Sequence, residues 1–188
     1  MMWVFGYGSL LWDPGFAVQR RVLARLPDYH RSFCMRSIHH RGTPEEPGLV
    51  LALDAAPGAA CHGLALGVDP AEADDVLAYL RARELISSAY VERVLEVEFP
   101  DATRVAAVTY VIDPDHVQYC GGLPLEEQAQ IISRAMGGRG PNSDYLHNTA
   151  AHLGTLGISD PDLDWLDARV RILLQQEGQK RDIPLAGR

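Results

Sequence analysis

The chain has 188 residues, of which 47% are hydrophobic and 22% charged, and its formal net charge at pH 7 is −8. These values are ordinary for a globular protein with one hydrophobic core. The acidic balance and the scattered basic residues argue against non-specific binding to nucleic acid or anionic membranes, because both require clustered Lys and Arg. A local basic pocket for a small anion stays open.

Strand patterns dominate the first half of the chain. Met2–Phe5 is a short apolar run closed by Gly6, and Arg31–Met35 is a weaker strand pattern. A first hairpin is predicted from Gly48–Leu53 and Ala60–Val68, which are separated by Asp54 and the turn dipeptide Pro57-Gly58. A second hairpin is predicted from Tyr90–Phe99 and Val105–Ile112, which are separated by a turn at Asp101.

Four segments carry helical patterns. Asp69-Pro70-Ala71-Glu72 is a capping-box variant that opens a helix running to Arg83. The others are Pro124–Met136 with Leu125, Ile132 and Met136 on one face and Gly137-Gly138 ending it, a helix from Tyr145 to Leu156 capped by Ser143-Asp144, and one opened by Asp160-Pro161 with Leu163, Leu166, Val170, Leu173 and Leu174 at helical spacing. We predict an α+β fold with a mixed sheet or open barrel, one domain over residues 1–176 and a loose polar tail over 177–188.

Three cysteines, Cys34, Cys61 and Cys120, are widely spaced and form no CxxC motif. This pattern favours free, mostly buried thiols over a disulfide framework, although a nucleophilic cysteine is an alternative. The sequence shows neither a signal peptide nor the roughly 18 apolar residues of a membrane span. We therefore predict a cytoplasmic protein.

Glu84 lies in an unexpected place on the first predicted helix. At about 100° per residue, Ala73, Leu77 and Leu80 fall within roughly 40° of Glu84 on the helical wheel. A carboxylate on this apolar stripe is expected to be partly desolvated, which raises its pKa toward the range useful for proton transfer near neutral pH. The alternative is that the helix frays and the side chain of Glu84 bends into water.

Gly6-Tyr7-Gly8-Ser9-Leu10 directly follows the first apolar strand. Two glycines flanking an aromatic residue allow a sharp turn and the close approach of a ligand to backbone N–H groups, which bind anions when they converge. No GxGxxG or GK[ST] pattern is present, so a dinucleotide or P-loop site is not predicted. The loop suits a small carboxylate; the alternative is a plain glycine turn.

These motifs and several others resemble the ChaC-type gamma-glutamylcyclotransferases. The matching segments, in chain order, are Met2–Trp12 (MWVFGYGSLLW), Ser37–Pro44 (SIHHRGTP), Arg83–Tyr90 (RELISSAY), Tyr119–Leu125 (YCGGLPL) and Gly137–Leu146 (GGRGPNSDYL). The resemblance runs from about Met2 to about Leu174 without a large gap. At Ser87-Ser88 the chain differs from many members, which have Gly or Thr nearby, and this difference bears on pocket shape and substrate range.

The resemblance implies the gamma-glutamylcyclotransferase-like fold, a small mixed β-barrel surrounded by helices. It implies cleavage of glutathione to 5-oxoproline and Cys-Gly, with no metal and no organic cofactor. Glu84 lies in the segment that carries the family's catalytic glutamate, so we expect it to act as the general acid and base. The backbone amides of Tyr7, Gly8, Ser9 and Leu10 are expected to bind the substrate's α-carboxylate.

Two further candidates come from the same resemblance. Tyr145 is expected to direct its hydroxyl to the substrate, with packing on the core as the alternative. Arg41, with His40, is expected to meet the glycine carboxylate of glutathione, with structural hydrogen bonding as the alternative. The histidines show no metal-ligand spacing, since His147 and His152 are five residues apart.

Two rival functions stay open. One is cyclotransfer on other γ-glutamyl amines or amino acids, and the other is a non-catalytic γ-glutamyl-binding module. The expected partner is a small molecule, glutathione; no nucleic acid or membrane partner is expected, and the sequence does not define the oligomeric state.

Overall fold

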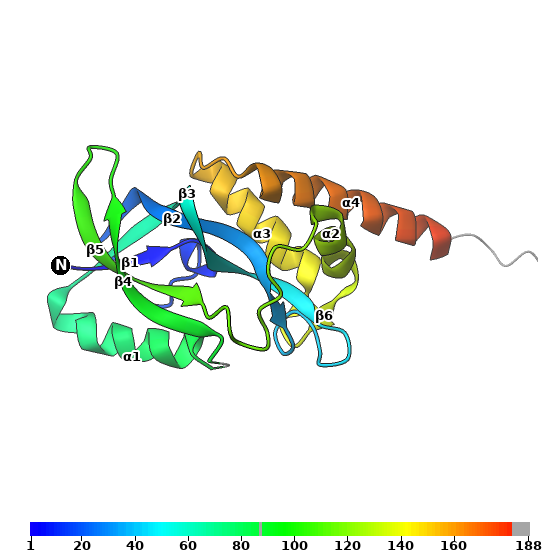
Figure 1. The fold of residues 1–188 in the computed structure, drawn as a ribbon, viewed down its shortest axis with the longest axis horizontal. Coiled ribbons are helices and arrows are strands. Elements are labelled where there is room, and N and C mark those ends of the chain that lie inside the picture. Colours follow the sequence, from blue (N-terminus) through cyan, green and yellow to red (C-terminus); the bar gives the residue numbers. More distant parts are fainter. Residues whose placement is uncertain (87, 182–188) are drawn as a thin grey trace, which may run out of the picture. The chain divides into compact units, whose positions relative to one another are not determined.

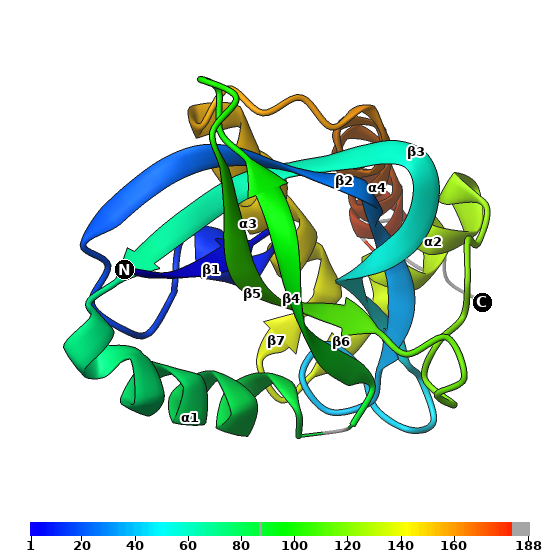
Figure 2. The same ribbon diagram turned by 60° about the vertical axis from the view of Figure 1, so that its left-hand side comes forward.

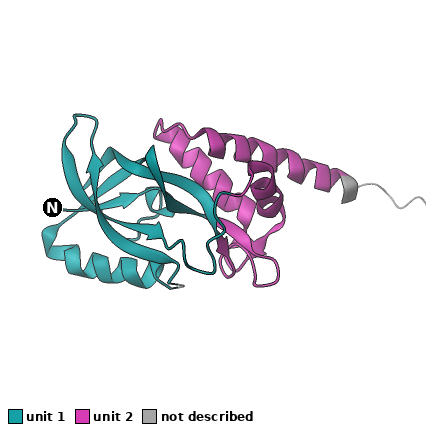
Figure 3. Ribbon diagram, in the orientation of Figure 1, with its two compact units in different colours: residues 1–35, 51–122 teal, residues 36–50, 123–188 magenta. Residues whose placement is uncertain are grey.

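A computed structural model describes residues 1–86 and 88–181 of the chain. The chain forms two compact units (Figure 3): unit 1 contains residues 1–35 and 51–122, and unit 2 contains residues 36–50 and the chain from Leu123 onward. This division into units does not test the prediction of one domain over residues 1–176, which stays a prediction. None of the helices in the described ranges combines the length and the apolar character needed to cross a membrane.

Unit 1 is built on a closed β-barrel (Figures 1 and 2) whose neighbouring strands follow the order β1-β3-β2-β4-β5. The bounds are β1 Met2–Gly6, β2 Arg20–Ser37, β3 Gly48–Val68, β4 Tyr90–Glu98 and β5 Arg104–Ile112, and the last residues of β2 and the first of β3 belong to unit 2. A parallel contact between Val4 and Val108 closes β1 onto β5. The mixed barrel confirms the predicted α+β class, and the barrel is closed.

The predicted first hairpin is wrong, because residues 48–68 form one continuous strand, β3. The Pro57-Gly58 dipeptide bends this strand without reversing it. Gly58 adopts a φ of +83°, and its N–H donates to the carboxylate of Asp28, which has a φ of +61° on the neighbouring strand β2. Both long strands therefore bend together (Figure 2), as strands do at bulges, where Pro and Gly are tolerated.

The predicted second hairpin is confirmed. Strands β4 and β5 pair antiparallel from Tyr90 opposite Ile112 to Glu98 opposite Arg104. The turn between them is held by the Phe99 N–H, which donates to the Thr103 carbonyl, and by the Asp101 carboxylate, which accepts from the Thr103 N–H.

The barrel interior is filled by side chains from all five strands. Trp3 and Phe99 pack edge to face with ring centroids 5.2 Å apart. The buried cluster consists of Phe5, Tyr7, Ala24, Leu26, Leu53, Cys61, Ala65, Val97, Phe99, Ala107 and Val111.

A short 3₁₀ turn, Pro70–Glu72, leads into helix α1, Ala73–Glu84. The predicted cap is confirmed, since the Asp69 carboxylate accepts from the Ala71 N–H. The buried residues of α1 are Val76 and Leu80, whereas Ala73 and Leu77 are only half-buried. The core-facing direction thus lies between Val76 and Leu80, and Glu84 follows Leu80 by about 40° at the edge of this face.

Unit 2 contains three helices, α2 Leu125–Arg134, α3 Asn142–Thr155 and α4 Pro161–Arg181, and a short ribbon of β6 Met136–Gly137 with β7 Gly140–Pro141. Helix α2 ends before Met136, which is 61% exposed, because Ala135 takes an extended conformation. Helix α3 begins at Asn142, ahead of the predicted cap.

Helix α4 confirms its predicted start and apolar face. The Asp160 carboxylate accepts from the Leu163 N–H, and the buried side chains of the helix recur at the predicted spacing, at Leu163, Leu166, Val170 and Leu173. The helix continues through Glu177 to Arg181, so the expected loose tail does not begin at Glu177; residues 182–188 lie outside the described residues.

One buried side chain joins the two sequence segments of unit 2. The Asn142 side chain, with no exposed surface, accepts from the Leu49 N–H at 2.7 Å and donates to the Leu49 carbonyl at 2.7 Å. The side chain of Asn142 therefore makes the same two hydrogen bonds to the Leu49 backbone that a neighbouring strand would make. Close packing accompanies this contact, since a Cβ on Gly48 would lie 2.1 Å from the carbonyl oxygen of Arg41.

We predict that Asn142→Ala lowers the free energy of unfolding by about 2–4 kcal/mol, because both buried backbone groups of Leu49 lose their partner. Urea denaturation measures this change. Asn148→Ala is the matched control, because Asn148 is exposed on the same helix. Equal midpoints for the two variants would contradict the assignment.

Candidate active site

The loop after β1 is held against the barrel. Thr109 donates its hydroxyl hydrogen to the Phe5 carbonyl at 3.1 Å, and the Tyr7 hydroxyl donates to the Tyr110 carbonyl at 2.9 Å. Tyr7 is 9% exposed and belongs to the barrel core. Its side chain therefore anchors the loop to the barrel.

The loop continues into a 3₁₀ turn, Ser9–Leu11, labelled η1. The first hydrogen bond of this turn runs from the Leu11 N–H to the Gly8 carbonyl at 2.9 Å. The N–H groups of Ser9 and Leu10 precede it and are not used by the turn itself. They are two of the four backbone donors, those of Tyr7, Gly8, Ser9 and Leu10, that the sequence predicts for carboxylate binding.

Glu84 is the last residue of α1, and its side chain is 20% exposed. The expected partial burial is thus present, and the helix extends as far as Glu84. Its Oε1 lies 3.2 Å from Nε of Arg83. Ser87, one of the two serines that distinguish this chain, lies outside the described residues.

Arg83 connects Glu84 to the loop after β1. Nη2 of Arg83 donates to the Ser9 hydroxyl at 2.8 Å, and Nη1 donates to the Asp13 carbonyl at 2.8 Å and to the Tyr79 hydroxyl at 3.2 Å. Ser9, Arg83 and Glu84 therefore form one connected group in unit 1. Sequence reasoning did not select Arg83 as a site residue, although it precedes Glu84 in the matched segment.

A second carboxylate, which like that of Glu84 acts on the Tyr110 phenol, was also missed from the sequence. Glu92 on β4 accepts two hydrogen bonds from Arg81, at 2.7 and 2.9 Å, and one from the Tyr110 hydroxyl at 3.0 Å. Burial, the hydrogen bond to Glu92 and the negative charges of Glu92 and Glu84 raise the pKa of Tyr110, so its phenol stays protonated. Arg81 above all lowers the pKa of Glu92.

In unit 2, Arg41 and Tyr145 are brought together. The Arg41 guanidinium lies 5.7 Å from the centroid of the Tyr145 ring, a cation–π distance. Its Nη1 donates to the carbonyls of Arg139 and Pro141 at 2.8 and 3.0 Å. These contacts support the structural alternative for Arg41 and show one use of the Tyr145 ring.

The neighbouring segment of unit 2 is tightly packed. A Cβ on Gly137 would lie 2.5 Å from the carbonyl carbon of His40 and 2.6 Å from the nitrogen of Arg41, so no larger residue fits without movement. Burial, followed by the charges of Arg139, His39 and Arg41, lowers the pKa of His40. His40 is therefore neutral at pH 7 and does not act as a second cation beside Arg41.

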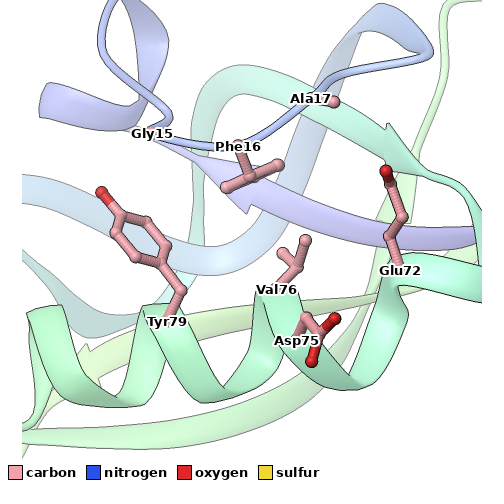
Figure 4. A pocket seen from close by; sticks show the side chains of 7 residues that line it. All are labelled: Gly15, Phe16, Ala17, Glu72, Asp75, Val76 and Tyr79. Carbon is pink, nitrogen blue, oxygen red and sulfur yellow. The ribbon is translucent and has the colours of Figure 1, made fainter.

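A cavity of about 280 Å³ lies in unit 1 between α1 and the loop after η1 (Figure 4). None of the sequence-predicted site residues lines it; its lining consists of Gly15, Phe16, Ala17, Glu72, Asp75, Val76 and Tyr79. Gly15 has a φ of +77°, and a Cβ there would lie 1.9 Å from the Tyr79 hydroxyl. The Tyr79 side chain thus packs directly against the loop backbone.

All three cysteines are free, as predicted from their spacing. Cys34 and Cys61 are buried, and Cys120 is partly exposed. Burial is the main factor that raises the pKa of Cys34 to about 12, which leaves its thiol protonated at neutral pH.

A sequence profile of the family described as "ChaC-like protein" matches residues 2–173. Gamma-glutamylcyclotransferase 2-3 of Arabidopsis thaliana is 35% identical to the chain, covering 97% of the chain and 94% of the relative. Glutathione-specific gamma-glutamylcyclotransferase of Escherichia coli is 32% identical, covering 93% of the chain and 75% of the relative.

Among solved structures, a crystal structure of a gamma-glutamyl cyclotransferase specific to glutathione from yeast superposes with a TM-score of 0.83. The match covers 91% of this chain and 96% of the yeast chain at 23% sequence identity. This likeness confirms the predicted gamma-glutamylcyclotransferase-like fold.

We predict that native protein treated with iodoacetamide at pH 8 is alkylated at Cys120 well before Cys34. At this pH burial keeps the Cys34 thiol protonated, and the side chain is also covered. Peptide mass spectrometry over time measures the order, and the unfolded protein, in which all three sites react alike, is the control. Equal native rates at Cys34 and Cys120 would revive the nucleophilic-cysteine alternative.

Proposed function

The chain belongs to the ChaC-like protein family, and we propose that it is an enzyme, a gamma-glutamylcyclotransferase that cleaves glutathione to 5-oxoproline and Cys-Gly. Relatives whose names state glutathione specificity support this substrate. The observation that carries the proposal is the half-buried Glu84 carboxylate, joined through Arg83 to the glycine-containing loop after β1.

The reaction is intramolecular. The α-amine of the γ-glutamyl group attacks the γ-carbonyl carbon, which forms the five-membered lactam of 5-oxoproline. The bond from that carbon to the cysteinyl nitrogen breaks, and Cys-Gly leaves. One proton must leave the attacking amine and one must reach the departing nitrogen.

Glu84 is the residue that we assign to this proton transfer. Its carboxylate takes the proton from the attacking amine and returns it to the leaving nitrogen, so no covalent enzyme intermediate is needed. General acid–base catalysis of this kind contributes about 10²–10⁴-fold to the rate. The position of Glu84 at the edge of the buried face of α1 supports this role, because the carboxylate is partly desolvated and still 20% exposed.

The loop after β1 supplies the second requirement, which is to hold a flexible substrate in a folded conformation. We assign the N–H groups of Ser9 and Leu10 to the substrate's α-carboxylate. Fixing the amine against the carbonyl recovers part of the roughly 7–11 kcal/mol available from orientation. A cytoplasmic location completes the proposal, because glutathione and free thiols both belong to a reducing compartment.

We predict that Glu84→Gln lowers kcat for 5-oxoproline formation about 10³-fold, because the amide cannot accept the proton. Glutathione and γ-glutamyl-alanine are each incubated with the protein, and 5-oxoproline and Cys-Gly are followed by mass spectrometry. Glu92→Gln is the matched control, since Glu92 is a second half-buried carboxylate of unit 1.

A loss in Glu92→Gln as large as that in Glu84→Gln would overturn the assignment of the base. Turnover of γ-glutamyl-alanine alone would move the substrate to other γ-glutamyl compounds. No 5-oxoproline from either substrate would favour the binding-module alternative.

We predict that Tyr145→Phe lowers kcat/KM for glutathione about tenfold, because a substrate hydrogen bond is lost while the ring beside Arg41 is kept. Steady-state kinetics and a urea denaturation curve are measured on the same preparation. An unchanged kcat/KM would reduce Tyr145 to the packing role that its contact with Arg41 already provides.

A further inference from the structure

We propose that Arg83 is a positioning residue of this site, which fixes the Glu84 carboxylate relative to the N–H groups of the loop after β1. The inference rests on the proposed function and adds a residue to it. Arg83 contributes no atom to the reaction; its role is to keep the base and the carboxylate-binding donors at a constant separation.

The first argument is that one guanidinium joins two parts of unit 1 that are far apart in sequence. Nε of Arg83 lies 3.2 Å from Oε1 of Glu84, and Nη2 donates to the Ser9 hydroxyl at 2.8 Å. Because the guanidinium is planar and rigid, these two contacts define the direction from Ser9 to the carboxylate. Ser9 is the first residue of the donor pair, so this part of the loop cannot shift without disturbing its hydrogen bond with Arg83.

The second argument comes from helix geometry. Consecutive residues of a helix point about 100° apart, and neighbouring side chains do not ordinarily face each other. The contact between Arg83 and Glu84 therefore requires the Arg83 side chain to fold back toward the carboxylate. Its other hydrogen bonds hold it in that conformation, and only 15% of the side chain is exposed.

The third argument is that the far side of the guanidinium is also fixed. Nη1 donates to the Asp13 carbonyl at 2.8 Å and to the Tyr79 hydroxyl at 3.2 Å. Tyr79 is itself packed against the backbone of Gly15 (Figure 4), where no Cβ fits. Arg83 is thus held by both the helix and the loop.

These contacts also separate positioning from the other role that an arginine at such a site could have, which is to bind a substrate carboxylate. Nε, Nη1 and Nη2 each already face an oxygen atom of the protein. A bidentate grip on a substrate carboxylate needs two adjacent N–H groups, and using them here would break the contacts to Ser9 or Glu84. We therefore expect changes at Arg83 to act on kcat and to leave KM nearly constant.

The test compares Arg83→Met and Arg83→Lys with wild type in steady-state kinetics on glutathione across pH. We expect Arg83→Met to lower kcat about a hundredfold, because a misplacement of about 1 Å between reacting groups can cost this much in rate. KM should stay within about twofold of the wild-type value. The acid limb of its kcat/KM profile should move to higher pH, because the Glu84 carboxylate loses the cation that favours its ionised form.

Arg83→Lys keeps the charge and loses the fork. We expect its acid limb to stay near the wild-type position while kcat falls about tenfold, which separates charge from geometry. Arg104→Met is the control, because Arg104 is an exposed arginine of unit 1 that pairs with the carboxylates of Glu96 and Glu98. It should match wild type in every parameter.

A raised KM at unchanged kcat in Arg83→Met would overturn positioning in favour of substrate binding. Wild-type kinetics in Arg83→Met would overturn the inference entirely. If Arg83→Met does not fold, Arg83→Lys decides, and an unchanged kcat there overturns the inference. A wild-type protein that forms no 5-oxoproline would instead overturn the proposed function, and the inference with it.

Discussion

The structure of unit 1 depends on the placement of β1 between β3 and β5. Five residues of β1 pair with β3, from Met2 opposite Val68 to Gly6 opposite Leu64, and Val4 meets Val108 on β5. The pairing is close, since a Cβ on Gly63 would lie 2.3 Å from the Gly6 carbonyl oxygen. Because the loop begins directly after Gly6, closing the barrel also determines where the N–H groups lie that we propose as donors to the substrate carboxylate.

The charge of the whole chain does not assist the proposed substrate. A protein of formal net charge −8 repels an anionic peptide at long range, so recognition has to come from local groups. Backbone N–H groups at the start of η1 supply partial positive charge without adding a mobile side chain. Arg83 in turn offsets the unfavourable position of a carboxylate at the C-terminal end of α1, where the helix dipole is negative.

The parts of the fold that depend on local patterns can be predicted from the sequence, whereas the parts that depend on contacts between distant segments cannot. The hairpin of β4 and β5 and the apolar face of α4 were predicted, because alternation and helical spacing are local patterns. The continuity of β3 was not predicted, because the neighbouring strand β2 determines whether the chain reverses or only bends at Gly58. Composition and spacing do not encode such a partner.

The candidate site shows the same limit. Glu84 and the loop after β1 were selected from local pattern and family resemblance. The link between them was not predicted, because Arg83 and Ser9 are separated by 74 positions and meet only in the folded unit. Likewise no local pattern distinguishes the structural role of Asn142, because its pairing with Leu49 is a property of the folded unit.

Two carboxylates lie near the Tyr110 phenol, and burial does not distinguish them, since the side chains of Glu84 and Glu92 are 20% and 23% exposed. Their partners do. Two hydrogen bonds from Arg81 and one from Tyr110 stabilise the ionised form of Glu92, which makes it a weak base. The contact of Glu84 with Arg83 runs through Nε, while Nη1 and Nη2 of that guanidinium donate to the Asp13 carbonyl and the Ser9 hydroxyl. The lowered pKa of Glu92 supports our proposal that Glu84, and not Glu92, carries the proton.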